Sequence, residues 1–347
     1  MGIEYYLNKF DLYQIKSFIE FFNMLLCSID VNSVYVNMQI RLLVENGGIM
    51  LKGIIIKGIS GFYYVEVGNQ LYECKARGLF RKKNITPLVG DRVSISVVDE
   101  DEKKGVIEDI HKRVSELVRP PIANVEKVII TFSIKEPSPN MSLLDKFIIF
   151  SEKENLEIVI VLSKIDLDKD GEITRSIKEE FEKIGYKVIT VSTVTGENID
   201  KVIEELEDSI SVFAGQSGVG KSSILNAIDP SFKLETAEIS KKLGRGKHTT
   251  RHAELYKIGK NAIIADTPGF SSLELNNIEI EELQEYFVEF GQYADCRFGS
   301  KCIHKNEPGC GVKEAVEGGN ISKRRYESYL HILDEINNLK GKFKRKL

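Results

Sequence analysis

The chain has 347 residues, of which 42% are hydrophobic and 29% charged, and its formal net charge at pH 7 is −4. This composition is typical of a globular protein of two or three domains with a sizeable core. It excludes a basic field over the whole surface, so nucleic-acid binding would need local patches. No apolar run is long enough to span a bilayer. Five cysteines, an odd number, argue against a secreted disulfide framework. We expect a cytoplasmic protein without membrane contact.

Residues 1–49 carry apolar side chains at roughly helical spacing between Phe10 and Leu26, which predicts an amphipathic helix. Directly after Met50 the pattern becomes strand-like. One interpretation is that translation starts at or near Met50 and that the earlier residues are an extension. The alternative is a genuine N-terminal helix that packs on the body. The intact mass of the native protein distinguishes the two.

Residues 50–118 read as five short strands separated by glycine and proline. Five strands in about seventy residues favour a small antiparallel barrel of the OB type. We expect the strands at 53–57, 62–67, 70–77, 91–97 and 104–110. Such barrels bind oligonucleotides through aromatic side chains and loop charges. Candidates for both are Tyr63, Tyr64, Tyr72, Arg77, Arg81, Lys82 and Lys83. The alternative is that these are ordinary strand tyrosines and a solvated basic loop.

Arg119-Pro120-Pro121 breaks helix and strand alike and predicts a domain linker. From residue 119 to about 275, apolar strands alternate with helical segments. The expected strands are 128–132, 158–162, 187–191, 210–214 and 262–265, and the expected helices 143–150, 173–184 and 199–206. This alternation predicts a parallel sheet covered by helices on both faces.

Residues 215–222 fit the pattern G-x-x-x-x-G-K-[ST] between a strand and a helix. Gly215, Gly218 and Gly220 allow the backbone to wrap closely around phosphates, towards which the helix N-terminus points. The pattern predicts that Lys221 reaches the β- and γ-phosphates and that the Ser222 hydroxyl binds Mg²⁺. A chance glycine-rich turn is the alternative, which the strand and helix on either side disfavour. The residues expected to contact the nucleotide are Gly215, Gln216, Ser217, Gly218, Val219, Gly220, Lys221, Ser222 and Ser223.

Polar residues follow two other strands at the edge where parallel sheets bind ligands. After the strand at 158–162 comes Ser163-Lys164-Ile165-Asp166. The Asp166 carboxylate can accept hydrogen bonds from the ring N–H and the amine of guanine, a donor pair that adenine lacks, and the Lys164 stem can lie along the base. Ser192 opens a turn, the base loop (residues 192–197), that either holds the other edge of the base or simply leads into a helix. Each signal is weak alone, but with the phosphate loop they favour GTP.

The strand at 262–265 leads into Asp266-Thr267-Pro268-Gly269. Asp266 is placed to hold Mg²⁺ through water, and the Gly269 N–H to face the γ-phosphate. The preceding segment, 244–252, is basic and is expected to close a threonine onto Mg²⁺. The predicted catalytic residues are Lys221, Asp266, Gly269, Thr249 and Thr250. The predicted Mg²⁺ ligands are Ser222, Thr250 and Asp266.

Residues 276–347 are mostly helical and polar and contain a cysteine–histidine cluster. Its ligands are Cys296, Cys302, His304 and Cys310. Three thiolates and one imidazole close a tetrahedral zinc site, which makes a structural role the expectation. The spacing differs from the common C-x₂-C, and scattered buried cysteines are the alternative. The basic tail, Lys340 to Lys346, either ends a solvated helix or contacts phosphates.

The usual GTPase places its base-recognition motifs after the phosphate motifs, and here they come first. In this order the chain resembles the circularly permuted GTPases of the ribosome small-subunit-dependent GTPase A (RsgA/YjeQ/YloQ) family. The likeness spans about 51–339 and rests on 116–125, the phosphate loop, 244–255, 266–270 and the cluster with Glu307-Pro308-Gly309-Cys310.

The resemblance implies an extension of doubtful status at 1–49, an OB barrel at 50–118, a permuted α/β GTPase domain at 119–275 and a helical zinc domain at 276–347. It implies a GTP hydrolase that binds rRNA, docks on the small ribosomal subunit late in its maturation and hydrolyses GTP to leave. We expect a monomer. The alternatives are a nucleotide-gated RNA-binding module and a translation-type GTPase that acts elsewhere.

Two residues depart from the expected pattern. Ser163 stands where the family has Asn or Thr, and its shorter side chain is expected to weaken the hydrogen bond that braces the base loop. Phe270 follows Asp-x-x-Gly, where many GTPases carry the glutamine that orients the attacking water. His248 and His252 are candidates to replace it, although solvated loop histidines are the commoner case. We therefore predict slow intrinsic hydrolysis that a partner accelerates.

Overall fold

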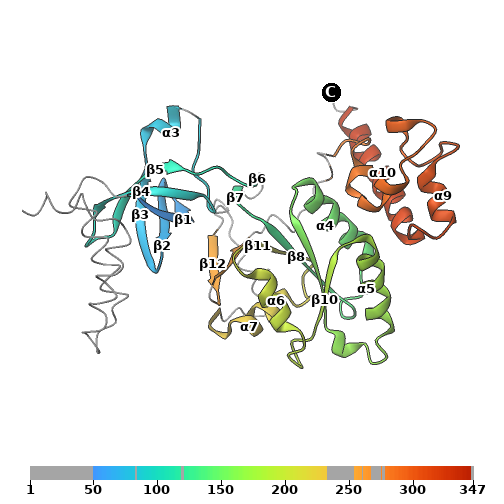
Figure 1. Cartoon of the computed structure of the whole chain (residues 1–347), viewed down its shortest axis with the longest axis horizontal. Coiled ribbons are helices and arrows are strands. Elements are labelled where there is room, and N and C mark those ends of the chain that lie inside the picture. The colour runs from blue at the N-terminus through green and yellow to red at the C-terminus, as the bar shows by residue number, and fades with distance from the viewer. Residues whose placement is uncertain are drawn as a thin grey trace, which may run out of the picture.

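The computed structural model of this protein describes residues 50–82, 84–118, 121–232, 254–259, 261–266, 275 and 278–344. The helix predicted in the first 49 residues lies outside this part of the chain. A β-barrel, a central sheet with its helices, and a group of C-terminal helices follow one another across the molecule (Figure 1). Among the described helices, none combines the length and the apolar character needed to cross a membrane.

The N-terminal part is a closed five-stranded barrel, as predicted, although one of its five strand pairings is parallel where an antiparallel barrel was expected. Its strands are β1 (Met50–Ile59), β2 (Phe62–Val67), β3 (Gln70–Ala76), β4 (Arg92–Asp99) and β5 (Lys104–Ile110). Strand β1 pairs with both β2 and β4, and β3 pairs with β5, so the sheet closes on itself. Gly53 lies in the part of β1 that pairs with both β2 and β4, and a Cβ there would come within 2.4 Å of the Glu66 carbonyl oxygen. The basic loop predicted after β3 contains a short helix, α3 (Gly78–Lys82).

Of the segment predicted as a linker, only Pro121 lies among the described residues, and it begins β7 (Pro121–Ala123), which pairs antiparallel with β6 (Glu116–Val118). A proline at the first position of a strand removes no interior ladder bond, which is why Pro121 is tolerated there. Asn124 then adopts a left-handed φ of 59°. Its side chain accepts from the Val114 N–H at 2.8 Å and donates to the Gly90 carbonyl at 2.9 Å. The barrel is thus hydrogen-bonded directly to the chain that enters the central sheet.

The central sheet has the strand order β10-β9-β8-β11-β13-β12. All neighbours are parallel except β12 and β13. The strands are β8 (Lys127–Ser133), β9 (Glu157–Ser163), β10 (Lys187–Val191), β11 (Ile210–Ala214), β12 (Glu254–Ile258) and β13 (Ala262–Asp266). Strand β12 was not predicted. It also pairs with β1 through Lys57 and Glu254, whose side chains form a 2.7 Å ion pair.

Helices cover both faces of this sheet, as the continuous apolar strands predict. One face is covered by α4 (Met141–Lys153) and α5 (Glu172–Ile184), and the other by α6 (Ile199–Leu206) and α7 (Lys221–Ile228). Alternate residues of β8 enter the two cores. Ile130 packs in the cluster that contains Leu144 and Phe181, whereas Ile129 packs with Val202 and Ile224. Because β8, β9, β10, β11 and β13 run parallel, their carboxyl ends lie at one edge of the sheet.

The C-terminal part surrounds an aromatic core formed by Phe287, Phe290 and Tyr329. Its elements are η6 (Leu283–Tyr286), η7 (Val288–Tyr293), η8 (Gly299–Lys301), α9 (Gly311–Glu317) and α10 (Lys323–Lys344). It lies against α4 and α5, on the far side of the sheet from the barrel (Figure 1).

Buried charges join α10 to the sheet's helices. The Arg325 guanidinium and the Asp145 carboxylate are both 0% exposed, and Nη1 donates to Oδ1 at 2.7 Å. Arg325 also donates to both carboxylate oxygens of Glu289, at 2.7 and 3.0 Å. Arg324 donates to the second oxygen of Asp145 at 2.7 Å and to Glu180 at 3.0 Å. We call these five residues the charge network, and it fixes α10 on α4 and α5.

Candidate functional site

The predicted phosphate loop connects β11 to α7 at the carboxyl edge of the sheet. Gly215, Gly218 and Gly220 have φ values of 131°, 84° and 101°, a region that side-chain-bearing residues rarely adopt. At Gly215 a Cβ would lie 2.2 Å from the Thr131 carbonyl oxygen, so glycine is also required there by space. The sequence pattern therefore reflects real backbone demands of this loop.

Lys221 turns back across the loop instead of pointing into solvent. Its Nζ donates to the carbonyl oxygens of Gly215 at 2.6 Å and Gln216 at 2.8 Å. Burial lowers the pKa of Lys221 to about 8. The ammonium group has neutral acceptors here and no carboxylate partner among the described residues. An anion bound in the loop would supply the missing countercharge.

Two residues at the end of β9 brace the phosphate loop. The Ser163 hydroxyl donates to the carbonyl oxygen of Val219 and lies 3.3 Å from that of Phe132. Lys164 has a left-handed φ of 60°, and its Nζ donates to the Gly218 carbonyl oxygen at 2.8 Å. The sequence pattern predicts this Ser163 hydrogen bond in the base loop, and that prediction is wrong. The hydroxyl holds the phosphate loop because β9 ends beside it.

The Asp166 carboxylate, two residues after Lys164, holds the base loop. The Ser192 hydroxyl donates to Oδ1 of Asp166 at 2.6 Å. The same hydroxyl oxygen accepts from the N–H groups of Val194 and Thr195, both at 3.2 Å. Ser192 is buried, whereas Asp166 is exposed. Asp166 is thus oriented at the sheet edge, with its second oxygen available to a ligand.

The remaining predicted site residues lie at the limits of the described chain. Asp266 ends β13, which pairs with β11 through Val212 and Ala265, so its backbone lies beside the phosphate loop strand. Ser222 is buried at the start of α7 and is followed by Ser223. The other candidates, Thr249, Thr250, Gly269, Phe270, His248 and His252, lie outside the described residues, as does the Asp266 side chain.

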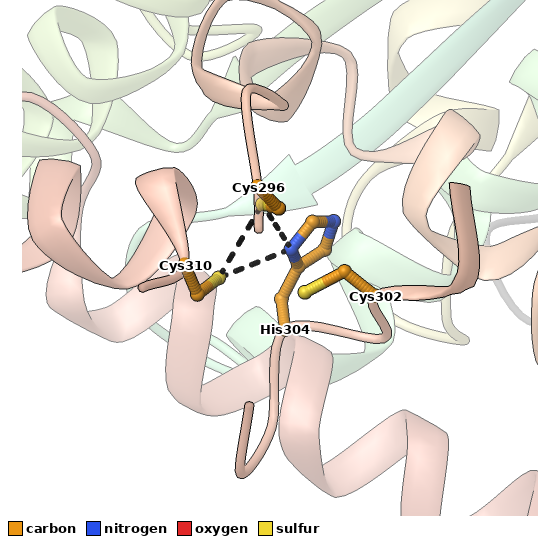
Figure 2. A group of neighbouring side chains, drawn as sticks. All are labelled: Cys296, Cys302, His304 and Cys310. Atoms are coloured by element: carbon orange, nitrogen blue, oxygen red, sulfur yellow. Dashed lines mark hydrogen bonds between the residues drawn. The ribbon is translucent and has the colours of Figure 1, made fainter. Parts of the chain in front are cut away.

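The four predicted zinc ligands come together in the C-terminal part (Figure 2). All four are buried, and their ligand atoms lie within 4.8 Å of one another. The Cys296 and Cys310 sulfurs are 3.7 Å apart, and the Cys296 sulfur is 3.5 Å from Nδ1 of His304. Tetrahedral Zn²⁺ with the usual bond lengths requires S···S and S···N distances of about 3.8 and 3.6 Å. The residues therefore fit a zinc ion.

Two residues to which the sequence assigns no role support this cluster. Gln284 of η6 places its Oε1 2.6 Å from Nε2 of His304, which assigns the proton to Nε2 and leaves Nδ1 for a metal. The Glu307 carboxylate accepts from the backbone N–H groups of Ile303, Lys305 and Asn306. Burial raises the pKa of Glu307, but these hydrogen bonds outweigh it and leave that pKa below its usual value. Gln284 belongs to no sequence motif, and Glu307 belongs to the Glu307-Pro308-Gly309-Cys310 stretch without a predicted role, so only the fold reveals what the two residues do.

Burial also favours the neutral forms of the cluster. It raises the pKa of Cys302 to about 12 and lowers the pKa of His304. A neutral imidazole is ready to bind metal, whereas the thiols must lose protons when a metal arrives.

The strand order and the chain order together define a class of protein. The phosphate loop follows β11, and the strands that carry Asp166 and Ser192 precede it in the chain while lying beyond β8 in the same parallel sheet. This arrangement is that of a circularly permuted P-loop GTPase.

Comparison with known proteins identifies the family. The RsgA GTPase family model matches residues 110–276, and the RsgA N-terminal domain model matches residues 52–107. The chain is 50% identical over 288 residues to the small ribosomal subunit biogenesis GTPase RsgA of Alkaliphilus metalliredigens, covering 83% of this chain and 98% of the relative. The chain belongs to the RsgA GTPase family.

Two solved structures agree with this assignment. The crystal structure of YjeQ from Thermotoga maritima is 40% identical, with a TM-score of 0.73 over 83% of this chain and 99% of that one. The structure of YloQ, described as a circularly permuted GTPase, is 39% identical, with a TM-score of 0.70 over 84% and 96%.

Proposed function

We propose that this protein is a GTP hydrolase that assists late assembly of the small ribosomal subunit, in the cytoplasm and as a monomer. The observation that carries the proposal is the junction of two loops at one sheet edge. Ser163 and Lys164 bond the phosphate loop, while Asp166 two residues later bonds Ser192 of the base loop. The relatives named for small-subunit biogenesis supply the biological setting.

In this proposal guanine donates hydrogen bonds to Oδ2 of Asp166, the oxygen that Ser192 does not use, and contacts the base loop. The β- and γ-phosphates lie in the loop from Gly215 to Gly220, where Lys221 exchanges its carbonyl acceptors for phosphate oxygens. Ser222, Thr250 and Asp266 hold Mg²⁺, which neutralises charge on the phosphates when bound. Thr249 and Gly269 belong to the segments that close on the γ-phosphate. Ser217 and Ser223 complete the polar surface of the loop.

The chain supplies no glutamine after Asp-x-x-Gly, because Phe270 occupies that place and cannot orient water. We therefore propose slow hydrolysis by the protein alone and stimulation by the small subunit, which would order or supply the missing group. The test is GTP turnover with and without purified small subunits.

The C-terminal cluster binds one structural Zn²⁺ in this proposal. Cys296, Cys302, His304 and Cys310 fill four positions and leave none for water, so the ion stabilises the fold and takes no part in hydrolysis. Metal analysis of the purified protein would show about one zinc per chain.

The barrel and the zinc-bearing part would both contact rRNA, mainly through its phosphates. A nucleotide-gated RNA-binding module is the second candidate. It predicts that Lys221→Ala, which blocks turnover, leaves release from the small subunit unchanged. A translation-type GTPase acting elsewhere predicts stimulation by something other than small subunits.

A further inference from the structure

The loop between the first two zinc ligands carries an exposed aromatic side chain. Residues 297–301 are all exposed, whereas Cys296 and Cys302 on either side are buried. Phe298 is 48% exposed, more than any other phenylalanine whose burial the structure describes. We call residues 297–301 the zinc loop. About half of the surface of Phe298 therefore stays accessible, although the buried Cys296 and Cys302 stand on either side of the loop.

The zinc loop is held in place by its own backbone. The N–H of Gly299 donates to the Cys296 carbonyl at 2.8 Å, and the N–H of Cys302 donates to that of Gly299 at 3.0 Å. The N–H of Arg297 donates to the Gly309 carbonyl at 3.0 Å, and the Arg297 stem lies against that glycine. Rigid presentation lowers the entropy that a partner must remove on binding.

The charges of the loop indicate what the partner is. Arg297 and Lys301 lie within three residues of Phe298, and neither has an ion pair in the described part of the chain, whereas Lys305 pairs with Asp334 nearby. Residues 297–301 contain no acidic side chain, in a protein whose net charge is −4. An exposed aromatic residue that is flanked along the chain by two cations without ion pairs among the described residues suits a single strand of nucleic acid, whose bases stack on aromatic rings and whose phosphates attract cations.

We propose that the zinc loop binds single-stranded nucleic acid, with one base stacked on Phe298 and with Arg297 and Lys301 contacting the flanking phosphates. A protein partner with an apolar pocket would also cover Phe298, but it would not require two free cations at its rim. The inference rests on the proposed function only in taking ribosomal RNA as the natural source of the strand. The barrel and the zinc loop would then contact RNA on opposite sides of the GTPase domain.

The test measures binding of a labelled oligouridine of about 12 nucleotides, a length typical of single-strand sites, to the full zinc-loaded chain. Phe298→Ala and Phe298→Leu should each weaken binding roughly tenfold, because both remove the stacking face. Phe298→Trp should retain wild-type affinity. Val288→Ala, which trims another exposed apolar side chain of the same part, is the matched control and should change nothing.

Charge variants provide an independent readout. Arg297→Ala and Lys301→Ala should each reduce the slope of log affinity against log salt by about 0.7. Equal binding by Phe298→Ala and wild type would overturn the proposal. Retention by Phe298→Leu with loss in Phe298→Ala would also overturn it, because an apolar contact without a stacking face would then be sufficient. Zinc content and basal GTP hydrolysis, measured alongside, should be the same in all variants.

Failure of the proposed ribosomal role and failure of the zinc-loop site give different results. If small subunits do not stimulate the wild-type protein but Phe298 still governs oligouridine binding, the ribosomal role fails and the zinc-loop site stands. If small subunits do stimulate it and Phe298→Ala binds both oligouridine and subunits normally, the zinc-loop site fails alone.

Discussion

The charge network between α10 and the GTPase domain makes a quantitative prediction. Asp145 and Arg325 are both fully buried, and Asp145 accepts a bond at 2.7 Å from Arg325 and another from Arg324. Asp145→Asn keeps the shape but removes the charge, which leaves two guanidinium groups sharing Glu289 and Glu180. Removing one partner of a buried pair costs about 3–5 kcal/mol, and the remaining carboxylates favour the lower value.

A loss of about 3 kcal/mol corresponds to roughly a 100-fold change in an opening equilibrium. Native-state hydrogen exchange of the α10 amides measures this opening directly. Protection of α10 should fall about 100-fold in Asp145→Asn, while the amides of the barrel strands keep theirs.

A matched control lies on the same helix. Lys323 and Glu327 form a pair at 3.9 Å whose side chains are 82% and 63% exposed. Glu327→Gln should cost less than about 0.5 kcal/mol, because exposed pairs contribute little. If Asp145→Asn changed α10 protection no more than Glu327→Gln does, the network would not hold α10 and the reasoning would be wrong.

Three further predictions concern the two sites. GTP affinity should fall up to tenfold per pH unit above pH 8. In the nucleotide-free protein the pKa of Lys221 is lowered to about 8, so above that pH binding requires uptake of a proton. Calorimetry in buffers of different ionisation heat measures that uptake. Ser192→Ala should weaken GDP binding about tenfold, since Asp166 loses its orienting hydrogen bond. Gln284→Ala should weaken zinc binding about 10- to 100-fold in a chelator competition, because His304 loses its fixed orientation.

Each of these has an outcome that contradicts it. Lys221→Arg stays charged throughout and should abolish the pH dependence, so a dependence that persists in this variant points to another group. Ser192→Thr keeps the hydroxyl and should bind GDP normally. Equal zinc affinity in Gln284→Ala and wild type would show that the imidazole is held by its other contacts alone.

Much of the fold could be predicted because apolar periodicity is a local signal. The strand expected at 158–162 is Glu157–Ser163, and those expected at 187–191 and 210–214 have the predicted limits. The missed elements have weak local signals. Helix α3 has five residues and no periodicity, and β12 is a short strand between β13 and β1 whose pairing with β1 joins it to the barrel.

The site could be predicted where chemistry follows spacing and not where it depends on distant contacts. The zinc ligands share one short stretch, and the phosphate loop has a fixed pattern of glycines. Gln284 reaches His304 from 20 residues away, and Asp145 meets Arg325 from 180 residues away. The Ser163 hydrogen bond was predicted in the wrong loop, because the strand end that Ser163 occupies faces the phosphate loop only in the folded sheet.

The central claim is that this chain hydrolyses GTP in response to the small ribosomal subunit. The direct measurement is GTP turnover by the full chain alone, with purified small subunits and, as a control, with large subunits. The proposal predicts slow turnover alone and clear stimulation by small subunits only. Turnover already at roughly tens per second without a partner, or stimulation by large subunits with none by small ones, would contradict it.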